Sequence, residues 1–152
     1  MLAYILILVR IPVYVCLTLA LSALYFVVTG VQFWGTAYLE SSLGGTQYEA
    51  NSLFIFTSAT GPTAGVFFGG WAVDYLGGYR GFKQRDRTMK LCAYLGFLSC
   101  AFGIPATFVS GIYKFTGLLW LMLFFGGSVL PGCTGVAVSI VPRSVMYNNN
   151  TE

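Results

Sequence analysis

The stretch GGWAVDYLGGYRG, residues 69–81, ends a long apolar segment with an aspartate, a pair of glycines and an arginine. It leads directly into RGFKQRDRTMK, residues 80–90, which is the most basic part of the chain. Charged side chains are costly inside a bilayer and collect where a helix leaves it. The change from apolar to charged residues therefore indicates the end of a membrane span. Similar changes elsewhere in the sequence should mark the ends of the other spans.

The overall composition supports a membrane protein. Of the 152 residues, 57% are apolar and 9% are charged, with a net charge of +3. A soluble domain has about 25% charged residues. This chain has too few charged residues for a water-facing surface, so the class of soluble proteins is excluded.

Charged residues are absent from four long gaps. Each gap exceeds the roughly 20 helical residues that cross a bilayer, and backbone in lipid must satisfy its own hydrogen bonds. We predict an all-α integral membrane fold with four transmembrane helices, near residues 13–37, 52–74, 91–112 and 116–141.

The basic residues predict the orientation. Placing the loop after the second span in the cytosol leaves only Lys114 outside, together with Glu40 and Glu49. Cytosolic loops carry the excess of lysine and arginine, so both termini are predicted to be cytosolic in a multi-pass protein. Seven basic residues then lie inside: Arg10, Arg80, Lys83, Arg85, Arg87, Lys90 and Arg143.

The residues that usually carry chemistry are scarce. The chain has no histidine, and no span contains a pair of carboxylates. We therefore expect no enzyme activity, no metal or other cofactor, and no nucleic-acid partner. The four cysteines are interpreted as small packing residues. They are Cys16, Cys92, Cys100 and Cys133.

Glycine has a regular spacing in the second predicted span. Gly61, Gly65 and Gly69 are four residues apart, and Thr57 lies one step earlier. This spacing puts small residues on one helix face, where a second helix can approach closely. We predict a helix-packing surface there, with a kink at Pro62.

The third and fourth predicted spans also contain helix-weakening residues. Pro105 interrupts the third span, and GGSVLPGCTG, residues 126–135, crowds the fourth. Broken helices are common in transporters, where they line a cavity or move. We favour a cavity-lining or moving role for these two spans. Simple close packing of the helices is the alternative.

The opening stretch also contains a motif. Its pattern G-x-x-x-D-x-x-G-G-Y-R resembles the cytoplasmic loop motif of the major facilitator superfamily. The resemblance implies a latch that holds one transport state, although Tyr75 replaces the usual basic residue. An alternative is that the aspartate caps a helix or forms an exposed ion pair. The latch residues by resemblance are Gly70, Asp74, Gly78 and Arg80.

Three further segments resemble one particular family within that superfamily. FVVTGVQFW at residues 26–34, VDYLGGYRG at 73–81 and TGVAVSIVPRSV at 134–145 are similar to spinster-like transporters of that superfamily. The resemblance implies a twelve-helix transporter, of which residues 1–152 would be a partial domain equivalent to helices seven to ten. The chain's partners would then be the lipid bilayer and the missing helices of the same transporter.

Polar residues on the first predicted span are candidates for a substrate cavity. Tyr25, Thr29 and Gln32 lie about one turn apart on an apolar helix, so they share a face that turns toward a cavity or a neighbouring helix. Both alternatives stay open, while Trp34 is interpreted as an interface anchor.

The expected function is transport of a small solute by alternating access. No span holds a buried carboxylate or histidine for a proton relay, or an arginine that would bind an anion. Either the coupling residues lie in the missing half of the transporter, or the substrate is largely apolar. The spinster-like resemblance suggests a lysolipid or sphingolipid. The alternative is a four-span structural or assembly protein that packs through its glycines.

Overall fold

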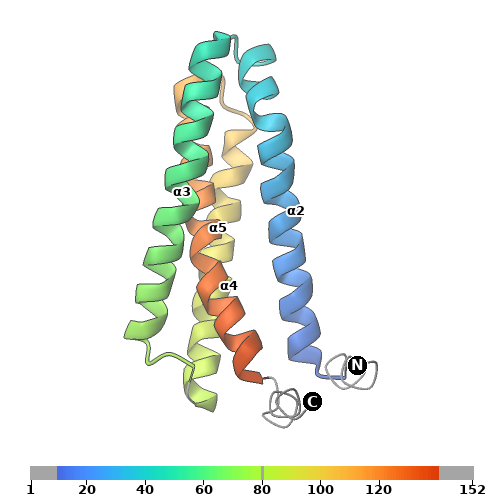
Figure 1. Ribbon diagram of the computed structural model, residues 1–152, viewed down its shortest axis with the longest axis vertical. Helices are drawn as coiled ribbons and strands as arrows, with labels where there is room; N and C mark the ends of the chain where they lie inside the picture. The colour runs from blue at the N-terminus through green and yellow to red at the C-terminus, as the bar shows by residue number, and fades with distance from the viewer. Residues whose placement is uncertain (1–9, 80, 141–152) are drawn as a thin grey trace, which may run out of the picture.

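The computed structural model describes residues 10–79 and 81–140, which form a bundle of four long helices (Figure 1). The helices alternate in direction, so the first and last described residues lie at the same end of the bundle (Figure 1). The described part does not include residues 1–9, Arg80 or residues 141–152, and Arg143 is among the last of these. The four helices are α2 (Pro12–Ser41), α3 (Gln47–Tyr75), α4 (Phe82–Ala106) and α5 (Ile112–Ile140).

The expectation of an all-helical fold with four long helices is confirmed, but one helix is misplaced. The third was predicted at 91–112, whereas α4 runs from Phe82 to Ala106. The basic residues 83–90 were assigned to a loop because they cannot lie in lipid, yet a helix can continue into water for several turns beyond the bilayer. Pro105 is the last residue but one of α4, so it lies at the end of this helix and does not interrupt it.

Three of the four helices are long and apolar enough to cross a membrane, within the residues that the structure describes. They are α2, α4 and α5, so the expectation of four such helices is corrected to three. The remaining helix, α3, has 29 residues and therefore sufficient length. Its sequence TSATGPTAG, residues 57–65, replaces large apolar side chains with threonine, serine and glycine, which lowers its hydropathy.

Both ends of α3 are closed by local hydrogen bonds. At its start, the Thr46 hydroxyl accepts from the backbone N–H of Glu49 at 3.3 Å, and the Glu49 carboxylate accepts from the Thr46 backbone N–H at 3.3 Å. This reciprocal arrangement is a capping box. At its end, Gly77 N–H donates to Asp74 O and Gly78 N–H to Val73 O, both at 3.0 Å. This is a Schellman motif, and Gly77 has the positive φ of +96° that favours glycine.

α5 lies at the centre of the packing. It makes most of the contacts between helices, chiefly with α3 and α4, whereas α2 touches α3 and α5 at fewer points. Only 6% of the most apolar part of α2 is buried, compared with 33% for α5. The sequence 126–135 was interpreted as a broken helix, but α5 continues through it, Pro131 included. The glycines of residues 126–135 therefore allow neighbouring parts of the chain to pack closely on α5, and they do not break the helix.

Candidate functional site

The glycine face of α3 packs directly on α5. Gly61, Gly65 and Gly69 are all buried. A methyl group at Gly65 would overlap the backbone of Phe124, and one at Gly69 would overlap the backbone of Ser128. The two helices are thus in backbone contact along two turns, which is the packing mode that small residues permit in membranes.

α5 contributes small residues to the same interface. Gly127 is buried beside the backbone of Pro62, where a methyl group would lie 2.7 Å from the Pro62 carbonyl oxygen. Thr57, one turn before the glycines, is also buried, and its hydroxyl has no hydrogen-bond partner among the described residues. The interface is therefore made of small residues on both sides, with one polar group enclosed.

Side-chain hydrogen bonds also join α5 to its neighbours. Trp120 Nε1 donates to the Thr60 hydroxyl at 2.9 Å, which links α5 to α3. The Ser99 hydroxyl donates to the Met122 carbonyl at 2.8 Å, which links α4 to α5. In the absence of a hydrophobic driving force between membrane helices, such bonds help to fix their register.

The predicted latch residues lie at the end of α3 and in the loop that follows. Gly70 is directed away from α5, with no atom near the position of a methyl group, and Asp74 is exposed. Gly78 has a φ of +69°, so it supports the turn. Arg80 lies outside the described residues, so its relation to Asp74 stays a prediction.

Sequence reasoning missed the residue that holds this loop in place. The Tyr79 hydroxyl donates to the Pro131 carbonyl at 2.8 Å, and its ring lies against Gly135. Burial, with a contribution from Asp74, raises the pKa of Tyr79 above its usual 10.0. The loop is also bound to α4, where Arg85 Nε donates to the Tyr79 carbonyl at 3.3 Å. The glycines of 126–135 were the available signal, because they leave room for a ring.

The cavity candidates lie on the outside of α2. Tyr25 is 57% exposed, and Thr29 and Gln32 are exposed as well. They share a helix but are not brought together with the latch residues, which lie at the far end of α3. Trp34 is also exposed. In this four-helix bundle these side chains are available to the bilayer or to further helices.

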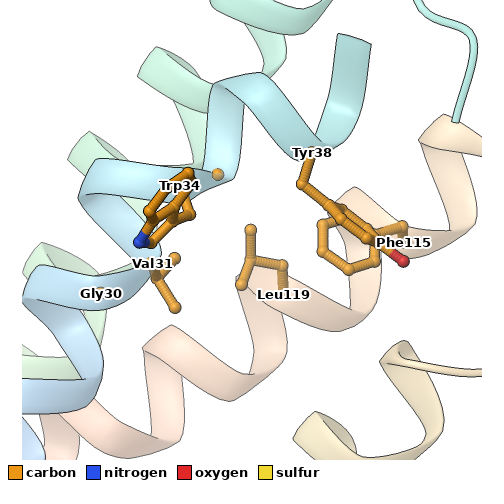
Figure 2. Close-up of a pocket in the computed structure, with 7 residues that line it drawn as sticks. Gly30, Val31, Trp34, Tyr38, Phe115 and Leu119 are labelled. Atoms are coloured by element: carbon orange, nitrogen blue, oxygen red, sulfur yellow. The ribbon is translucent and has the colours of Figure 1, made fainter. Parts of the chain in front are cut away.

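An open apolar hollow of about 250 Å³ lies between α2 and α5 (Figure 2). The rings of Tyr38 and Phe115 close one side of it, with centroids 5.0 Å apart. Thr29 and Gln32 do not line it. Its lining residues are Gly30, Val31, Trp34, Gly35, Tyr38, Phe115 and Leu119. The hollow reflects the loose contact of α2 with the rest of the bundle.

No group of three potential metal ligands occurs within residues 10–79 and 81–140. The polar groups of the described helices are mainly hydroxyls, and charges lie near the helix ends.

A family comparison identifies the chain. The model of the Organic Anion Transporter Polypeptide (OATP) family matches residues 1–114, which include α2, α3, α4 and the first residues of α5. The chain belongs to this family. No curated protein and no solved structure matches it. Together with the membrane-spanning helices, membership in a transporter family fits a multi-pass membrane protein.

The OATP match corrects the spinster-like resemblance, which was wrong. Short patterns such as FVVTGVQFW combine residues that any membrane helix uses for packing and interface anchoring, so they do not separate one transporter family from another. The suggestion of a lysolipid substrate rested on that resemblance and loses its support with it.

Proposed function

We propose that this chain works as part of a membrane transporter that moves organic anions across the bilayer. Membership of the Organic Anion Transporter Polypeptide family carries the proposal. The helices long enough to span the membrane support it, because a solute path needs several such helices around it.

The packing suggests which helices move together during alternating access and which one contacts the solute. α3, α4 and α5 form one closely packed unit, joined by the glycine contacts and by the bonds from Trp120 and Ser99. α2 is attached loosely and has polar residues on its exposed face. We propose that the closely packed unit moves as one body, while α2 contacts the solute or the other half of the transporter.

The four helices fit a larger bundle of the major facilitator type, in which they would correspond to helices seven to ten. In such a bundle, the exposed side of α2 and the open side of Gly70 would meet further helices. Asp74 would keep its proposed role as a latch near a moving contact, with both termini cytosolic. The partners would be the bilayer, the solute and those additional helices.

The described helices offer neutral donors to an anion. Lysine and arginine in this part of the chain lie near helix ends and not at mid-membrane depth. Tyr25, Thr29 and Gln32 carry hydroxyl and amide groups that can donate hydrogen bonds. We therefore propose that α2 orients the anion, and that the compensating positive charge comes from another helix of the transporter.

Transport into liposomes tests the proposal. The complete transporter that contains these helices should take up fluorescein, an organic anion, faster than a neutral dye of similar size. Thr29→Ala and Gln32→Ala should raise KM roughly 2- to 10-fold, the loss expected for one hydrogen bond. Ser41→Ala is the matched control, because Ser41 is an exposed hydroxyl residue of the same helix on the side away from Tyr25 and Gln32.

The outcomes separate the alternatives. Anion uptake no greater than that of empty liposomes would refute transport and favour a four-span structural or assembly protein. Uptake that is equally sensitive to Ser41→Ala and Thr29→Ala would refute the role of the polar face, while transport itself would stand. Asp74→Asn should change the transport rate without changing the amount of protein, and an unchanged rate would refute the latch.

A further inference from the structure

Three basic residues occupy one exposed face of α4. Lys83, Arg87 and Lys90 are spaced by four and three residues, so their side chains lie one above another. All three are exposed. The opposite face of α4, which includes Thr88 and Cys92, is buried. The basic face therefore points away from the bundle, at the end where the described chain begins and finishes (Figure 1).

The charge on this face is only partly balanced. Lys90 Nζ lies 2.7 Å from the Asp86 carboxylate, in a salt bridge that is exposed to solvent. Asp86 can offset one cation, so a net positive charge stays on the face with Lys83 and Arg87. An anionic partner would complement this charge.

The same face continues into the apolar part of the helix. Tyr94 is 71% exposed and Phe97 is 74% exposed, four and seven residues after Lys90. At 1.5 Å per residue, Phe97 lies about 10 Å from Lys90 along the axis. Tyrosine is enriched at the membrane interface, where its ring is apolar and its hydroxyl meets headgroups. Cations, a tyrosine and a phenylalanine thus follow one another from water into the bilayer.

We propose that this face binds an anionic phospholipid, with its phosphate on Lys83 and Arg87 and an acyl chain along Tyr94 and Phe97. The order of charge, interface and apolar groups on the helix matches the order of groups in such a lipid. Free phosphate would match the cations alone and would leave the exposed rings without a partner. The inference concerns the outer surface of α4 and does not depend on which solute is transported.

Native mass spectrometry of the full chain provides the test, with lipid supplied as phosphatidylcholine and phosphatidylserine in mixed micelles. The wild-type chain should retain phosphatidylserine preferentially. Each basic residue near an anionic surface strengthens binding roughly 5-fold, so Lys83→Gln with Arg87→Gln should reduce the preference by about 25-fold. Higher salt should also reduce it.

A matched variant controls for charge alone. Lys114 is an exposed lysine at the opposite end of the bundle, so Lys114→Gln should leave the preference unchanged. Arg87→Lys should retain most of the preference, because it keeps the positive charge. An unchanged melting temperature of the double variant would show that its loss of lipid is not a folding defect. Excess inorganic phosphate should fail to displace the lipid, because it lacks the acyl chain.

Three results would overturn the proposal. One is a double variant that retains phosphatidylserine as the wild type does. Another is an equal loss in Lys114→Gln, which would mean that net charge decides. Displacement by inorganic phosphate would assign the cations to a free anion instead of a lipid.

Discussion

The hydroxyl of Tyr79 donates a hydrogen bond to the carbonyl oxygen of Pro131, 2.8 Å away and 52 positions later in the chain. The contact joins the short loop after α3 to the inner face of α5. It lies one helical turn beyond Gly127, whose carbonyl lacks its usual partner because proline at position 131 has no N–H. The loop is therefore attached to α5 at the proline whose missing N–H interrupts the backbone hydrogen bonding of that helix.

Tyr79→Phe should destabilise the chain while keeping the ring in place against Gly135. The lost hydrogen bond corresponds to about 1 kcal/mol of unfolding free energy. Thermal unfolding in detergent measures the difference. An unchanged melting temperature would show that the hydroxyl contributes nothing.

The same variant should change the response to high pH. The pKa of Tyr79 is raised above 10.0 in the folded chain, so the unfolded chain loses this proton first. The contribution of Tyr79 to stability is therefore complete below pH 10 and declines as the pH rises above it. Tyr79→Phe should flatten that part of the decline, and an identical pH dependence in both chains would contradict this.

Gly69 and Gly70 are neighbours with opposite surroundings, which gives a matched pair of substitutions. Gly69→Ala places a methyl group on the backbone of Ser128 and should cost about 1–3 kcal/mol. Gly70→Ala meets no atom in this bundle and should be neutral or stabilising, since alanine favours a helix by about 1 kcal/mol over glycine. Equal melting temperatures for the two variants would refute the close approach of α3 and α5.

The bond between Trp120 and Thr60 should be measurable as a coupling energy. A double-mutant cycle with Trp120→Phe and Thr60→Val removes each partner separately and then both. Interhelical hydrogen bonds in membranes average about 0.6 kcal/mol, so a coupling of this size is expected. A coupling of zero would mean that the two side chains do not meet.

Labelling of two exposed positions tests the orientation. Phe82, at the start of α4, is 89% exposed, and Ser42, after α2, is exposed at the other end. In a background without the native cysteines, Ser42→Cys should react in intact cells with a thiol reagent that cannot cross membranes. Phe82→Cys should react only after the cells are opened, and the reverse pattern would invert the topology.

The sequence predicts the elements of this fold better than their contacts. Gaps between charged residues locate the helices because lipid excludes charge, but they cannot show that α4 continues through residues 83–90 into water. The spacing of Gly61, Gly65 and Gly69 predicts a close-packed face, whereas the identity of α5 as its partner depends on the three-dimensional arrangement. Tyr79 has no local signal for its bond, because its acceptor is distant in sequence.

The dependence of α3 on α5 has a consequence for biosynthesis. Among the described helices, α3 is not apolar enough to count as a membrane span, and its glycine face is covered by a helix that begins at Ile112. During translation, α4 must emerge before α5 can dock. A newly made α3 therefore has an uncovered glycine face until both α4 and α5 have been synthesised.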